Sequence, residues 1–102
     1  EILKEMLSCI NKDFARIGEK EPVSTDFDFS FDALIETLVP VIDKLYCQHQ
    51  QKFQALLYRV DISENVLLKA VEGKKGNEMM NEIAAVIVKR ELQKAVLRKF
   101  YK

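Results

Sequence analysis

The chain has 102 residues, of which 48% are apolar and 31% are charged. This composition fits one folded domain over residues 1–102 and excludes a disordered chain. Basic and acidic residues balance at 16 each, which argues against a dedicated nucleic-acid-binding protein. No apolar run approaches the roughly 18 residues that span a bilayer, so we expect no membrane contact.

The first predicted element is an amphipathic helix over residues 2–18. Its apolar residues recur three and four positions apart, as on one face of an α-helix: Leu3, Met6, Leu7, Ile10, Phe14 and Ile17. We expect Lys12 and Asp13 on the remaining faces. Gly18 suits a helix end where the backbone needs a positive φ.

Residues 19–30 read as a loop because they combine a proline with a cluster of Ser, Thr and Asp. Three of the six phenylalanines alternate with polar residues at its end: Phe27, Phe29 and Phe31. Either their rings close one end of the bundle, with Asp28 or Ser30 capping the next helix, or Phe27 and Phe29 form an exposed docking loop. Burial is favoured, because exposing a Phe forgoes roughly 2 kcal/mol.

The longest pattern predicts a helix over residues 31–59. Its apolar residues share one face: Phe31, Leu34, Ile35, Leu38, Val39, Val41, Ile42, Leu45, Tyr46, Phe53, Leu56, Leu57 and Val60. Pro40 normally ends or kinks a helix, yet the apolar phase is the same on both sides of it. We therefore predict one helix bent at residues 36–40. At about 45 Å it exceeds a compact domain of about 34 Å, so it must bend, protrude or be shared with a second chain.

His49 is the only histidine and falls within the apolar stripe of this helix. A buried His can act as an acid or base, but nothing nearby completes a catalytic set. We therefore expect a buried structural residue, hydrogen-bonded to a carbonyl or to Tyr46. Cys47 and His49 point about 200° apart on a helix and cannot share a metal ion. The sequence predicts a protein that is not an enzyme and has neither metal nor cofactor.

The two cysteines, Cys9 and Cys47, lie far apart in a chain with no disulfide framework. We expect reduced, partly buried thiols, since free Cys is commonly buried. Reduced thiols favour a cytoplasmic location.

A short helix is predicted over residues 64–72, with Ser63 as its N-cap, and a final helix over residues 78–101. The first half of the final helix has an apolar face that includes Met80, Ile83 and Ile87. Past Val88, charged residues take over the same azimuth: Arg90, Glu91, Lys94 and Arg98.

We expect this charged face to leave the core after Val88. An apolar seam lies opposite it: Val88, Leu92, Ala95 and Val96. The sequence favours contact of this seam with a second copy, which would make the protein a homodimer. Packing of the seam on the helix over residues 2–18 of the same chain is the alternative.

The end of the chain is basic, with six basic residues and one acidic residue in 89–102. Arg90, Lys94 and Arg98 form a candidate contact for phosphates or an acidic protein surface. Nucleic acid is disfavoured, because the helix opens with acidic and apolar residues where a recognition helix carries polar ones.

Two runs carry a resemblance: QALLYRVDISENVLLKAV over residues 54–71 and VKRELQKAVLRKFY over residues 88–101. They resemble small all-helical bacterial proteins of unassigned function. The resemblance implies an α-helical fold and no activity.

The predicted fold is all-α, an irregular four-helix bundle with a long Pro-kinked second helix and a short third helix. The predicted function is a non-catalytic interaction module, homodimeric through the C-terminal helix. The alternative is a small regulator that binds nucleic acid or an acidic partner through the basic stripe. A third class is the binding of a small apolar ligand among the Phe and Met side chains.

Overall fold

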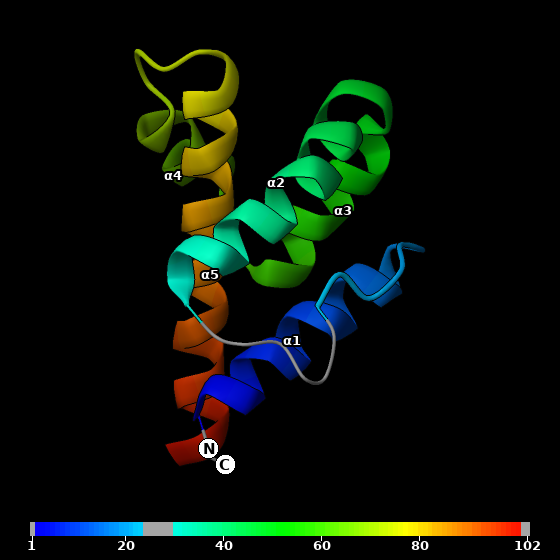
Figure 1. Cartoon of the computed structure of the whole chain (residues 1–102), viewed down its shortest axis with the longest axis vertical. Helices are drawn as coiled ribbons and strands as arrows, with labels where there is room; N and C mark the ends of the chain where they lie inside the picture. Colours follow the sequence, from blue (N-terminus) through cyan, green and yellow to red (C-terminus); the bar gives the residue numbers. More distant parts are fainter. Residues whose placement is uncertain (1, 24–29, 101–102) are drawn as a thin grey trace.

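The computed structural model describes residues 2–23 and 30–100, and within them the chain is all-α, as predicted. Its helices are α1 (Ile2–Arg16), α2 (Phe31–Gln48), α3 (Gln50–Val60), α4 (Glu64–Ala70) and α5 (Gly76–Phe100). The described residues thus form five helices where four were predicted. The longest, α5, contacts each of the other four, so the fold is built around it (Figure 1).

The segment that follows α1 is tied back onto that helix. Gly18 has a φ of +86°, the positive value predicted for it. The Asn11 side chain accepts a hydrogen bond from the main-chain N–H of Val23 at 3.1 Å and donates one to its carbonyl at 2.9 Å. Val23 is buried, so the end of this segment joins the core.

The helix α2 begins as predicted, with the Ser30 hydroxyl accepting a hydrogen bond from the N–H of Ala33 at 3.0 Å. Pro40 lies inside α2, which is helical on both sides of it. Proline removes the N–H that would bond to the carbonyl of Glu36. Both Pro40 and Glu36 are exposed, so water can take up that carbonyl. The predicted bend at Pro40 stays a prediction.

The predicted single helix over residues 31–59 is wrong, and the break falls at His49. This residue has φ −137° and ψ 64°, and it separates α2 from α3. The chain turns back there, so that α3 returns beside α2 (Figure 1). His49 is exposed, which also corrects its prediction as a buried structural residue.

Molecular size gives the physical reason for this break. The molecule measures 35 × 26 × 25 Å, whereas an unbroken helix over residues 31–59 would extend about 45 Å. Because the chain turns back at His49, the apolar faces of α2 and α3 both pack into the same core. The Tyr46 and Phe53 rings, one on each side of the turn, meet edge to face with centroids 5.3 Å apart.

The helix α4 has the predicted N-cap, with the Ser63 hydroxyl accepting from the N–H of Val66 at 3.3 Å. It ends at Ala70, and α5 starts at Gly76, slightly before the predicted position. No helix among the described residues is long and apolar enough to cross a bilayer.

Candidate functional site

The second half of α5 does not turn its charged face away from the core. Val88 and Ala95, predicted to contact a second chain, are buried in the core of their own chain. Leu92 and Val96 are half-buried. The prediction is therefore corrected for Val88 and Ala95, because α1 packs along this part of α5 (Figure 1).

Three ionisable side chains meet where α1 crosses α5, and we call them the buried charged cluster: Asp13, Glu91 and Lys94. The Lys94 Nζ lies 2.6 Å from Asp13 Oδ2 and 3.1 Å from Glu91 Oε1. It also donates to the main-chain carbonyl of Arg59 in α3 at 3.0 Å. One ammonium group thus links three helices.

Glu91 is the most unusual member of this cluster. Its side chain is 0% exposed. Apart from the Lys94 ammonium 3.1 Å from Oε1, its carboxylate oxygens have no hydrogen-bond partner among the described residues. Burial, then the nearby Asp13 carboxylate, raises the pKa of Glu91 to about 8, although Lys94 partly opposes the shift. The direction of this shift favours the protonated form of Glu91.

Burial also shifts the pKa values of Lys94 and Cys9, which lie in the same region. Burial alone would lower the pKa of Lys94, but its hydrogen bond to Asp13 and the nearby carboxylates outweigh that effect and raise the pKa. Burial raises the pKa of the Cys9 thiol, partly opposed by Arg98. The Arg98 Nη1 lies 3.5 Å from Cys9 Sγ. An ammonium and a guanidinium thus lie beside a thiol and two carboxyl groups.

The predicted basic stripe is largely engaged within the chain. Arg90 pairs with Asp61, its Nη2 lying 2.7 Å from Oδ2, and Lys94 belongs to the buried charged cluster. Arg98 remains exposed but contacts Cys9. These internal bonds weaken the alternative in which the stripe binds phosphates or an acidic partner.

Asp13 is the residue that sequence reasoning missed, because it was assigned to a polar face of the first helix. It is 5% exposed. Cys9 and Asp13 follow Met6 at spacings of three and four, which places both on the margin of the buried face of α1. That spacing was the available signal. Phe27 and Phe29, the candidate docking loop, lie outside the described residues.

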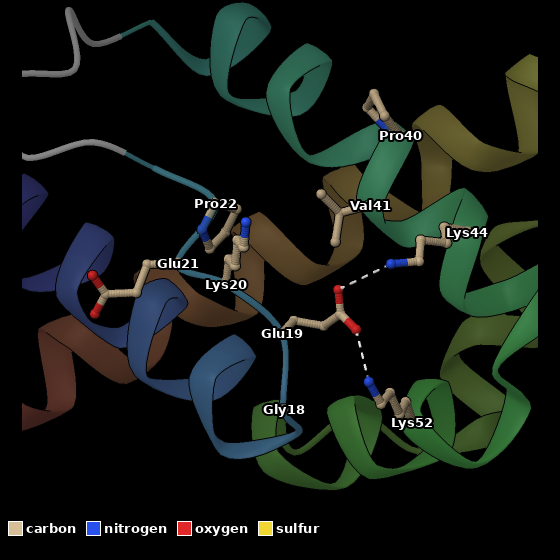
Figure 2. Close-up of a pocket in the computed structure, with 9 residues that line it drawn as sticks. All are labelled: Gly18, Glu19, Lys20, Glu21, Pro22, Pro40, Val41, Lys44 and Lys52. Carbon is tan, nitrogen blue, oxygen red and sulfur yellow. Dashed lines mark hydrogen bonds and ion pairs between the residues drawn. The ribbon is translucent and has the colours of Figure 1, made fainter.

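A separate hollow of about 560 Å³ lies between the end of α1 and the α2–α3 hairpin (Figure 2). Glu19 reaches into it and pairs with Lys52 at 3.0 Å and with Lys44 at 3.8 Å. The hydrogen bond from Lys52 is the main cause that lowers the pKa of Glu19. Because Glu19 bridges these two lysines and offsets part of their charge, we interpret the hollow as a clamp between helices rather than an anion site.

Several apolar side chains of the last turns of α5 are exposed or only partly buried. Leu97 and Phe100 are 48% and 63% exposed, and Leu92 and Val96 are half-buried. We call these four residues the outer face of α5. A groove of about 230 Å³ between α4 and α5 lies on the same side of α5, lined by Ile62, Val66, Val86, Lys89, Arg90 and Gln93.

Within the described residues, no three His, Cys, Asp or Glu side chains are grouped so that they could hold a metal ion. No known family model, curated protein or solved structure matches the chain. The resemblance to small helical bacterial proteins therefore stays a prediction, and function has to be argued from the surfaces and groups described above.

Proposed function

We propose that this chain is a non-catalytic interaction module that forms a homodimer through the outer face of α5. The observation that supports it is the inverted polarity of the last turns of this helix. Charged Glu91 and Lys94 point inward, while Leu97 and Phe100 are exposed. Large apolar side chains gathered on one exposed helix face are typical of a protein contact.

The charges along α5 favour a second copy in antiparallel orientation. Glu78 and Glu82 precede Val96 and Phe100 by 18 residues, which is about five full turns, so all four lie on one side of the helix. The outer side of α5 is thus acidic near its start, while its end is apolar with Lys99 beside it. In an antiparallel pair, the acidic turns of one copy lie near the basic end of the other.

The size of the contact also matters, because a specific interface buries about 1,000 Å² or more in total. The outer face of α5 supplies only part of that area. The groove between α4 and α5 extends it, with Val66 exposed at its edge. We therefore expect α4 to contribute to the interface.

Sedimentation equilibrium at micromolar concentrations tests the proposal with variants at the most exposed positions. We expect a wild-type dimer, and a folded monomer for the double variant Leu97→Glu, Phe100→Glu, because exposed side chains add little to the chain's own core. Tyr58→Glu on α3 is the matched control, since Tyr58 is 83% exposed but distant in sequence from α5, and we expect it to remain dimeric.

A charge exchange tests the orientation. Glu82→Lys should weaken the dimer, and adding Lys99→Glu should restore it if the helices pair antiparallel. A wild-type chain that is monomeric at several hundred micromolar would refute self-association. Equal dissociation by Tyr58→Glu would refute the assignment to α5.

A further inference from the structure

The packing of α1 on α5 encloses the carboxyl group of Glu91, and burial there disfavours its ionised form. Glu91 is completely buried, and its one compensating contact among the described residues is the Lys94 ammonium, 3.1 Å from Oε1. A buried carboxylate is strongly disfavoured unless donors compensate it. The nearest ammonium, that of Lys94, is already shared with Asp13 and the carbonyl of Arg59.

The groups around Glu91 come from three helices. On α1 they are Asp13 and Cys9, and on α5 they are Lys94 and, next to Cys9, Arg98. The helix α3 contributes a main-chain carbonyl, and the groups that act on the Glu91 carboxyl include no side chain from α2 or α4. Two buried carboxyls therefore face one ammonium. Ionising both would place two negative charges against a single positive one, which favours a proton on the more buried carboxyl, that of Glu91.

We propose that Asp13, Glu91 and Lys94 form a proton-dependent latch, which holds α1 on α5 while Glu91 carries a proton and loosens when alkaline pH removes it. The latch does not depend on the proposed dimer, because its residues are buried within one chain. α1 is the element expected to move, since it supplies Asp13, whereas Glu91 and Lys94 both lie on α5.

The sign of the effect follows from the proton affinity of Glu91. Its pKa is raised from 4.5 to about 8 in the closed structure, whereas an opened α1 would return it to an ordinary value near 4.3. Between these values the closed form holds a proton that the open form lacks. The stabilisation is therefore complete below pH 4.5 and is lost as pH rises through about 8, with opening favoured up to tenfold per pH unit.

Hydrogen exchange of α1 amides at pH 6.5 and 9, corrected for the intrinsic rate, measures this opening. We expect α1 to open about 30-fold more readily at the higher pH, while the amides of α2 and α5 change little. Glu91→Gln, which cannot ionise, should abolish the pH effect. Glu82→Gln, on the opposite side of α5, should retain it.

Carbon NMR of a chain labelled at the Glu carboxyls supplies a second measurement that does not depend on the variant's folding. The proposal expects the Glu91 signal to titrate near pH 8. A Glu91 signal that titrates below pH 6 would overturn it. Alkaline loss of protection that is uniform over all helices, or unchanged in Glu91→Gln, would overturn it as well.

Discussion

The two halves of α5 keep the same side inward but bury different chemistry. Residues 76–88 place Met80, Ile83 and Ile87 in the core, whereas residues 89–100 place Glu91 and Ala95 there, with Lys94 beside them. A rigid helix cannot rotate its inner side halfway along, so the neighbouring helices fix which side is inside. Charged side chains can lie on the inner side of the second half because Asp13 of α1 pairs with Lys94 there.

The two halves should also differ in how they stabilise the fold. Burial of apolar side chains is favourable by roughly 25 cal/mol per Å². A buried ion pair loses much of its Coulomb energy to desolvation, so intact it contributes little, yet breaking it is costly. We therefore expect truncation to be costly in both halves, but for different reasons.

Ile87→Ala should give the largest loss, about 3–4 kcal/mol in the free energy of unfolding. Ile87 is completely buried, and its truncation removes apolar contact and leaves a cavity. Urea denaturation monitored by circular dichroism measures the loss. A cost below about 1 kcal/mol would show that the first half of α5 is loosely packed, and the contrast between the halves would fail.

Lys94→Met should cost about 2–3 kcal/mol at pH 7, because it leaves Asp13 buried without its cation. The figure is below the usual range for a buried pair, since the Lys94 side chain is 17% exposed. The same denaturation experiment measures the loss.

The matched control for Lys94→Met replaces the whole buried charged cluster by apolar residues, Asp13→Leu, Glu91→Leu and Lys94→Met together. We expect this triple variant to be within about 1 kcal/mol of wild type, or more stable. If the triple variant is as unstable as Lys94→Met alone, the charged cluster stabilises the fold by more than apolar side chains in the same place would.

Local signals in the sequence were sufficient for most helix boundaries. Ser30 and Ser63 cap the helices that they were predicted to cap, and Gly18 has the positive φ expected after α1. These features depend on a few neighbouring atoms. The break at His49 was not predictable in this way, because the apolar phase is continuous across it and neither Gly nor Pro marks it. It follows from the size of the whole molecule.

The buried charged cluster could be predicted only in part. Helical periodicity places Glu91 and Lys94 on the same side as Ile83 and Ile87, and that placement is correct. The error was the assumption that a charged face has to leave the core. Recognising the cluster required a partner from another helix, and nothing in the local sequence pairs Asp13 with residues about 80 positions away.

Asp61→Asn should have the smallest effect, about 0.5 kcal/mol or less, although the 2.7 Å ion pair that it breaks is nearly as short as the 2.6 Å pair of Lys94 with Asp13. The Asp61 side chain is 79% exposed and that of Arg90 is 27% exposed, so water and salt screen the pair. Asn also tolerates the left-handed backbone of Asp61, whose φ is 69°, and the bond from Arg90 Nε to the carbonyl of residue 61 can remain. Urea denaturation at low salt and at 0.5 M salt should show a small loss that fades as salt rises. A loss above about 1.5 kcal/mol that does not change with salt would mean that the exposed Arg90–Asp61 pair contributes as much stability as the buried Lys94–Asp13 pair. The difference in burial would then not explain the strength of these two ion pairs.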